Sequence, residues 1–449
     1  MVGGRVIDPE SGLDKIVNIG IEGNKITTIS CSDIEGDDII SVAGLVVAPG
    51  FIDIHMHEDP ITHLEGEVSY PTFDRMVSMG VTTAVGGNCG YSRYPLQPYF
   101  ALLEAQGIPL NYAGFSGYIS IREAIGLVDR YQPADADQKV QIQDLIRQEL
   151  ESGAVGISFG LEYAPGITTK EAIDAAKVVA EFPGRLISAH FRADCEHAVE
   201  SIEELTEIAR LTGVPMQISH LGSCAAFPGI MEDALRTLDE ARSEDIDVMG
   251  DCYPYNCFCT SIGSAVFDPG CFAKWGVEPS ALMVAEGPHR GERCDEALFA
   301  QLRVEAPETM VIGFVMNDDE VIRAIRHPLI MLCSDGSFRG DQGHPRGAGT
   351  FPRVLGRMVR EEKTISMMEA LAKMTIVPAR RLNLKHKGRV TVGADADLVI
   401  FDPERIMDKA DFDSPTDAPE GIEMVIVQGT PVVRNNRIVS RQAGQVIRF

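Results

Sequence analysis

The sequence predicts an α/β fold: a (β/α)8 TIM-type barrel with a small β-sandwich domain formed by both chain termini. Two observations lead to this prediction. Between residues 51 and 384, short apolar runs alternate with helical patterns, as in repeated strand-helix units whose strands pair in parallel. The two ends of the chain instead carry short segments in which apolar and polar residues alternate between Gly, Asn and Asp turns.

Eight strands are expected in the middle of the chain. Each is a short apolar run, as expected of a strand that is buried on both faces of a parallel sheet. Residues 138–152 are a representative helix, because their apolar positions recur near the 3.6-residue period and Gly153 follows as a stop. The strands are expected to begin near Phe51, Thr82, Leu110, Val155, Arg185, Pro215, Ile246 and Leu329.

The small β domain is expected to comprise residues 1–49 and 385–449, and the barrel residues 50–384. The stretch near 268–310 is longer than an ordinary connection between a strand and a helix, so it is expected to be an insertion near the mouth of the barrel. Strand candidates in the β domain are residues 17–21, 25–29, 396–401, 424–427 and 430–434.

Composition narrows the class of protein. The 449 residues include 40 basic and 66 acidic side chains, a net charge of −26, which argues against nucleic-acid and membrane partners. The ten cysteines follow no regular spacing, which favours reduced thiols and a cytoplasmic location. Neither a signal peptide nor an apolar stretch of about 18 residues is evident in the sequence, so secretion and membrane insertion are not expected.

Six side chains that bind metals or move protons stand at the ends of expected strands. His55 and His57 follow the first of them, and alternate residues on a strand point to the same side. The other four each close a later apolar run: Cys89, His190, His220 and Asp335. The carboxyl ends of barrel strands meet at one face. Several imidazoles with a carboxylate there suit zinc or a similar divalent ion, with a position left open for water.

Longer motifs give this pattern a family resemblance. They are GNCG at 87–90, GLEYAPG at 160–166, HFR at 190–192, DCYPY at 251–255 and HPRGAGTFPR at 344–353. Together they resemble the N-acyl-D-amino-acid deacylase (D-aminoacylase) family of the amidohydrolase superfamily, nearly end to end. The resemblance implies a metal-dependent hydrolase that cleaves a linear amide in a small carboxylate-bearing substrate, with an N-acyl-D-amino acid as the first expectation.

The resemblance also implies a ligand set. Many superfamily members bridge two metals with a carboxylated lysine, but no lysine lies between Lys139 and Lys170, around the fourth strand. Cys89 is similar to the cysteine that fills this role in D-aminoacylases, and metal binding lowers the pKa of a thiol. Zinc is thus expected in one tight site made by Cys89, His190 and His220. Whether His55 and His57 reach the same ion or a second, weaker one is left open.

Further roles follow from the same resemblance. Asp335 is expected to act as general base and acid, and Tyr163 to stabilise the oxyanion together with the metal. Arg346 and Tyr253 resemble the family's clamp for the substrate carboxylate. Two positions depart from the family pattern, where a lysine and a serine are replaced by Gly222 and Cys259, although Thr260 or Ser261 could supply the hydroxyl.

Alternatives remain open at this stage. A cyclic-amide hydrolase of the dihydroorotase or hydantoinase kind shares the barrel and the His-x-His pattern, but the missing lysine counts against it. A non-catalytic scaffold predicts decay among the six candidate ligands, which is not observed. Glu162 lies near a strand end and could be a metal ligand, but a solvated loop carboxylate is the main expectation. Trp275 could line the substrate pocket, but a packing role in the insertion is the main expectation. The sequence leaves the oligomeric state open, and a homo-oligomer is compatible with it.

Overall fold

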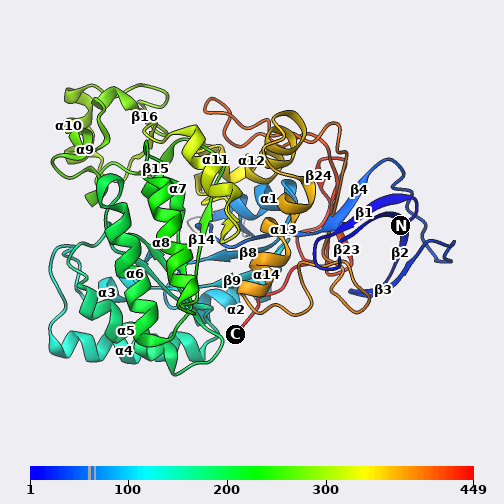
Figure 1. Ribbon diagram of the computed structural model, residues 1–449, viewed down its shortest axis with the longest axis horizontal. Helices are drawn as coiled ribbons and strands as arrows, with labels where there is room; N and C mark the ends of the chain where they lie inside the picture. Colours follow the sequence, from blue (N-terminus) through cyan, green and yellow to red (C-terminus); the bar gives the residue numbers. More distant parts are fainter. Residues whose placement is uncertain (59–61, 65–66) are drawn as a thin grey trace.

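The computed structural model describes residues 1–58, 62–64 and 67–449, and the fold is mixed α/β (Figure 1). Parallel strands with their connecting helices make up the central part of the chain, and a sheet formed by both ends lies beside it. None of the helices in the described ranges is long and apolar enough to cross a membrane.

The parallel strands form two hydrogen-bonded sheets. The first contains, in spatial order, β5 (Phe51–Asp53), β8 (Val81–Gly86) and β9 (Asn111–Gly114). The second contains, in spatial order, β10 (Ser116–Gly117), β11 (Gly156–Gly160), β12 (Leu186–His190), β13 (Met216–Ile218), β14 (Val248–Cys252) and β18 (Ile330–Leu332). All eight strands expected from the apolar runs are present, each starting within two residues of its expected position.

The described strands do not pair into one closed barrel. The first sheet ends at β9, and the second begins at β10. A single residue separates these two strands in the sequence. At the opposite edges, the segments after β5 and β18 meet through an isolated parallel bridge between Met56 and Gly336. There the amide of Asp335 donates to the carbonyl of His55 at 2.8 Å. The described strands follow the order expected of the barrel, but their hydrogen bonds do not close it completely.

Helices connect these strands. The helix expected over 138–152 is confirmed as α4 (Ala136–Glu151). Its N-terminus is stabilised by a capping box, in which the Asp135 carboxylate accepts from the amide of Gln138. The others are α1 (Pro71–Ser78), α2 (Leu96–Gln106), α3 (Tyr118–Ala124), α5 (Thr169–Ala180), α6 (Ala198–Thr212), α7 (Leu221–Ala225), α8 (Met231–Ser243), α11 (Asp318–Arg326), α12 (Arg346–Arg353), α13 (Met367–Met374) and α14 (Ile376–Arg381).

Both ends of the chain contribute to one eight-stranded sheet. Antiparallel pairing of β4 with β21, in the register Ala48 with Val399, joins the two halves. Because these strands form a single hydrogen-bonded sheet, the expected β-sandwich is not confirmed. In spatial order the strands are β24 (Arg437–Ile438), β23 (Thr430–Arg434), β22 (Ile422–Val427), β21 (Leu398–Phe401), β4 (Val46–Pro49), β1 (Gly4–Asp8), β2 (Leu13–Glu22) and β3 (Lys25–Ser30).

A separate three-stranded antiparallel sheet occupies the region of the expected insertion. Its order is β15 (Phe258–Ser261), β17 (Met310–Gly313) and β16 (Leu282–Val284). The short helix α9 (Cys271–Trp275) and α10 (Glu296–Glu305) accompany it, at the upper left of Figure 1. Two small hairpins complete the fold: β6 (Thr62–Leu64) with β7 (Glu67–Ser69), and β19 (Phe338–Arg339) with β20 (Gln342–Gly343).

Candidate active site

The six strand-end side chains expected from the sequence lie together. The Sγ atom of Cys89, after β8, is 3.3 Å from His55 Nε2 and 3.4 Å from His220 Nε2. At the end of β12, His190 places its Nδ1 atom 3.0 Å from His220 Nε2. All of these side chains are buried. Residues separated by up to 165 positions in the sequence therefore form one cluster.

His57 and Asp335 complete the cluster. The Nε2 atom of His57 lies 3.1 Å from Asp335 Oδ1, and His55 Nε2 lies 3.5 Å from the same oxygen. Asp335 is buried, whereas 26% of the His57 side chain is exposed. One face of the cluster is therefore open to solvent.

Metal binding requires neutral imidazoles, and the hydrogen bonds around two of them favour one tautomer each. Glu162 Oε2 lies 3.0 Å from His190 Nε2, so in the neutral ring this nitrogen donates and Nδ1 carries the lone pair. The hydroxyl of Ser223 donates to the carbonyl of His220 at 3.0 Å, which leaves its oxygen to accept from His220 Nδ1 at 2.8 Å. His190 Nδ1 and His220 Nε2 thus direct two lone pairs at one another. Such an arrangement is favourable when both bind the same cation.

Two groups of donors within the cluster fit a divalent metal ion, and His190 belongs to neither group. Ligand atoms of His55, Cys89 and His220 lie within 4.8 Å of one another, as do those of His55, His57 and Asp335. A zinc ion about 2.0–2.3 Å from each ligand spans such separations. Burial opposes ionisation of Cys89, but the nearby His55 and His220 rings lower its pKa well below the ordinary value. A thiolate is the form that binds metal.

Three residues of the cluster adopt left-handed backbone conformations. The φ angles are 56° for Cys89, 35° for His220 and 48° for Asp335. Such angles are uncommon for side chains other than Gly, Asn and Asp, and they persist only where the surrounding structure enforces them. The turns that follow β8, β13 and β18 therefore aim these side chains at the cluster, at a conformational cost for Cys89 and His220.

A buried arginine lies beside Asp335. Arg346 Nη2 lies 2.9 Å from Asp335 Oδ2, and the guanidinium stacks 4.5 Å from the centre of the Tyr253 ring. Burial would raise the pKa of Asp335, but Arg346 and the histidines hold it well below its ordinary range. Among the residues that the structure describes, Arg346 Nε and Nη1 have no hydrogen-bond partner. Two buried donors thus remain for an anionic group.

The cluster opens into a small cavity of about 30 Å³. Polar groups on its wall include Tyr163, Tyr253, Thr260 and Asp335, and apolar groups include Phe258. The Thr260 hydroxyl lies 3.4 Å from the Tyr163 hydroxyl, and burial together with Cys89 and Asp335 raises the pKa of Tyr163. Tyr163 therefore remains a hydrogen-bond donor at neutral pH.

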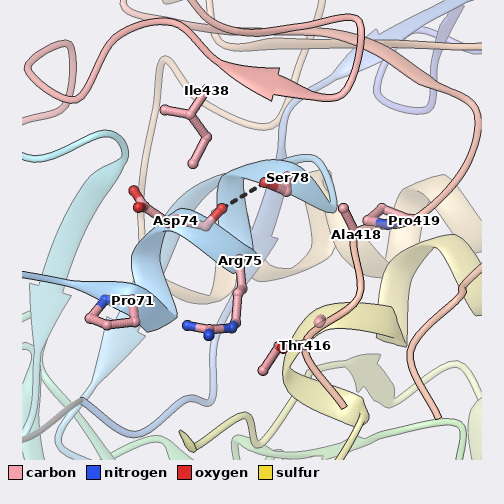
Figure 2. Close-up of a pocket in the computed structure, with 9 residues that line it drawn as sticks. Pro71, Asp74, Arg75, Ser78, Thr416, Ala418, Pro419 and Ile438 are labelled. Atoms are coloured by element: carbon pink, nitrogen blue, oxygen red, sulfur yellow. Dashed lines mark hydrogen bonds between the residues drawn. The ribbon is translucent and has the colours of Figure 1, made fainter. Parts of the chain in front are cut away.

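A larger cavity lies between α1 and the C-terminal segment (Figure 2). Its wall contains Asp74, Arg75 and Ser78, and the Ser78 hydroxyl donates to the carbonyl of Asp74 at 2.8 Å. The Asp74 carboxylate is paired with Arg441 at 2.9 Å. Because the described residues that line it include neither an imidazole nor a thiol, the metal-type cluster remains the candidate active site.

Full-length relatives identify the family. A profile of the Amidohydrolase family matches residues 297–433. The N-acyl-D-glutamate deacylase of Alcaligenes xylosoxydans xylosoxydans is 34% identical, over 98% of this chain and 96% of its own length. The D-aminoacylase of the same organism is 31% identical, over 100% of this chain and 96% of its own length. This chain belongs to the N-acyl-D-amino-acid deacylase family of amidohydrolases.

Solved structures of the deacylase family share the fold. A D-aminoacylase matches with a TM-score of 0.89 at 29% identity, over 100% of this chain and 99% of the other. A second match is an N-acyl-D-glutamate deacylase from Bordetella bronchiseptica, complexed with zinc and a phosphonate mimic of the tetrahedral intermediate. Its TM-score is 0.87 at 31% identity, over 100% of this chain and 98% of the other. A dihydropyrimidinase with a TM-score of 0.63 at 19% identity shares the fold alone. The chain is a metal-dependent hydrolase of carbon–nitrogen bonds.

Two positions where this deacylase departs from the family motif have structural explanations. A Cβ atom at Gly222 would lie 3.0 Å from both Cys252 Sγ and Met316 Cε, so Met316 fills the space beside it. Cys259 contributes its carbonyl, which accepts from Arg346 Nη2 at 3.4 Å. The pocket hydroxyl in this strand belongs to Thr260, the first of the two alternatives to Cys259.

The expectation for Glu162 is wrong. Its carboxylate is buried beside His190 instead of being solvated, because the inserted segment covers it with Lys274, whose Nζ atom lies 3.5 Å from Glu162 Oε1. The packing role expected for Trp275 is confirmed, since this residue is buried among aromatic rings and its Nε1 donates to Asp194 Oδ2 at 2.7 Å.

Sequence reasoning also missed Asp251. This residue is fully buried near the end of β14, with Oδ1 3.2 Å from His55 Nδ1 and 2.7 Å from the amide of His220. Gln217 Nε2 donates to its other oxygen at 2.8 Å. A carboxylate of this kind orients a metal-binding imidazole and fixes its tautomer. The signal in the sequence was an acidic residue inside an otherwise apolar strand.

Proposed function

We propose that this protein removes the acyl group from N-acyl-D-amino acids, or from similarly small amides that carry a carboxylate, with zinc as its metal. The observation that carries this proposal is the position of Arg346. Its two unpartnered buried donors lie beside Asp335 and the metal-type cluster, where a substrate carboxylate would be held next to the reacting amide.

We also propose how the chain is organised around this chemistry. Residues 50–384 form the catalytic (β/α)8 barrel, with an inserted segment near 268–310, and residues 1–49 and 385–449 form the accessory β domain. The strand order and the bridge between Met56 and Gly336 support the barrel assignment. Pairing of β4 with β21 supports the assignment of one domain to both ends of the chain.

The metal would be held by Cys89, His190 and His220, with His55 and His57 reaching the same ion or a second one. When bound, a divalent ion polarises a carbonyl group and makes water easier to deprotonate. The opposed lone pairs of His190 and His220 and the low pKa of Cys89 support this ligand set. Asp335 completes it through its contact with His57.

The side chains around the cluster divide the remaining tasks. Asp335 is held ionised, so it accepts the proton of the attacking water and delivers it to the leaving nitrogen. Tyr163 stays protonated and donates to the carbonyl oxygen as negative charge develops there. Arg346 and the Tyr253 hydroxyl hold the substrate carboxylate. The Tyr253 hydroxyl is suited to this task because its neighbour, Met316 Sδ at 3.9 Å, is a weak acceptor.

The proposal is tested by measuring hydrolysis of matched N-acetyl- and N-formyl-amino acids in both configurations, with zinc-reconstituted protein and parallel metal analysis. Turnover confined to the D-substrates supports the proposal and identifies the preferred side chain. Zinc-loaded protein that opens dihydropyrimidine or hydantoin rings, yet leaves every acyl-amino acid intact, would overturn it in favour of a cyclic-amide hydrolase.

A further inference from the structure

Glu162 contacts the proposed metal site without belonging to its ligand set. It follows β11, and its Oε2 atom lies 3.0 Å from His190 Nε2. A carboxylate that accepts from the far nitrogen of an imidazole fixes the ring orientation and makes the other nitrogen a better ligand. Here that other nitrogen is His190 Nδ1, which faces His220.

The inserted segment supplies a cation to this carboxylate. Lys274 lies on α9, and its Nζ atom is 3.5 Å from Glu162 Oε1. The same ammonium pairs closely with Asp194, which also accepts from Trp275 Nε1 at 2.7 Å. Trp275 in turn packs between Phe258 and Phe267, with ring centres 5.5 and 5.9 Å away. The position of Lys274 is therefore fixed by an aromatic cluster of the insertion.

This chain of contacts is energetically demanding. Glu162 and Asp194 are both buried, and only 22% of the Lys274 side chain is exposed. Burial works against the charge on Lys274, but the carboxylates of Asp194 and Glu162 outweigh this effect and raise its pKa. Removing one partner from such a group leaves a buried charge uncompensated. Each charge is thus kept in place by the others.

We propose that Glu162 is a positioning residue that acts on the metal site through His190, and that Lys274 of the inserted segment holds the Glu162 carboxylate in position. The inference rests on the proposed metal site. According to this proposal, the insertion supports the metal site and also forms a wall of the substrate pocket. It also explains why an acidic residue at position 162 is buried and not solvated.

The test measures zinc affinity, by competition with a chromogenic chelator, for the full-length protein and four variants: E162A, E162Q, K274M and the double variant E162A/K274M. Loss of an outer contact to a ligand typically costs about 10–100-fold in metal affinity, which is the result expected for E162A. E162Q should lose less, because its amide oxygen still accepts from His190 Nε2. K274M should weaken zinc binding in the wild-type background and cause no further loss in E162A.

The matched control is K170M, which removes an exposed lysine whose 2.8 Å pair with Asp174 lies on the outer surface. Its zinc affinity should equal that of wild type. E162A and E162Q proteins that unfold normally in the metal-free state and bind zinc within about twofold of wild type would overturn the role of Glu162. If K274M lowered zinc affinity equally in the wild-type and E162A backgrounds, Lys274 would not act through Glu162.

These outcomes are separable from failure of the proposed function, because zinc affinity is measured without substrate. Wild-type protein that binds no zinc would refute the metal site and the proposed function together. Wild-type protein that binds zinc, with E162A unchanged, would refute only the positioning role. Loss of affinity in E162A supports that role even if no acyl-amino acid proves to be a substrate.

Discussion

Arg346 Nη2 lies 2.9 Å from Asp335 Oδ2, and both side chains are buried. One guanidinium therefore serves two tasks in the proposed site. Its charge lowers the pKa of the Asp335 carboxylate, while its Nε and Nη1 atoms, unpartnered within the described part of the chain, remain for the substrate. In the proposed mechanism, binding of the substrate and readiness of the base would thus be coupled through a single residue.

Replacement of Asp335 by Asn should abolish turnover with little change in metal content. The amide cannot accept the proton of the attacking water, and loss of a general base typically costs about 10²–10⁴-fold in rate. The measurements are kcat on the best D-substrate and bound zinc per chain. D341N is the control, because Asp341 is exposed in the hairpin that follows. D335N protein with a normal rate would refute the assignment.

Replacement of Arg346 by Lys should raise KM for carboxylate-bearing substrates by about 10–100-fold. Hydrogen bonds to charged groups contribute about 1.5–3 kcal/mol, and the ammonium group of lysine lacks the planar, two-pronged arrangement of donors in a guanidinium. The corresponding carboxamide substrate, which has no charge to bind, should be affected much less. The comparison uses R339K as control, because Arg339 is exposed and paired with Glu286. Equal losses on both substrates would show that Arg346 does not recognise the carboxylate.

Replacement of Cys89 by Ala should cost more zinc affinity than the 10–100-fold typical of an outer contact, because it removes a ligand itself. Chelator competition and metal analysis measure the effect. C294A is a matched control, since Cys294 is equally buried but lies in the inserted segment. If C89A retained zinc as wild type does, the proposed tight site would need a different third ligand.

The strand-end residues could be found from the sequence because they depend on local pattern. His190, His220 and Asp335 each close a short, mainly apolar run, so a parallel arrangement of strands brings them together. The roles of Asp251 and Glu162 were not recognised, for the opposite reason. Their roles come from contacts with His55 and His190 that no local spacing encodes.

Strand pairing was also only partly predictable. The apolar runs give the position of each strand, but not the hydrogen bonds between its edges and those of its neighbours. The two parallel sheets therefore show the expected strand order, whereas β9 and β10 belong to different sheets. In the terminal domain, the pattern along residues 17–21 and 396–401 indicated strands, but not the pairing of β4 with β1 and β21, which joins both ends of the chain into one sheet.

Lys373 should give the folding stability a pH dependence at alkaline pH. This side chain is 7% exposed, its Nζ atom donates to the Ile330 carbonyl at 2.8 Å, and burial lowers its pKa from 10.5 to about 8. Below pH 8 the native state bears the full cost of this buried charge, about 3 kcal/mol for such a pKa difference. Between about pH 8 and 10.5 the unfolded chain binds more protons at this lysine, so the stability of the wild type rises with pH.

The measurement is urea unfolding of wild type and K373M from pH 7 to 10. Other titrating groups cancel in the difference between the two proteins, so the wild type should gain stability relative to K373M as the pH rises above 8. K177M serves as the control, because Lys177 is exposed and its removal should give a difference that does not change with pH. A difference between wild type and K373M that stays flat across this range would show that Lys373 is charged in the native state throughout.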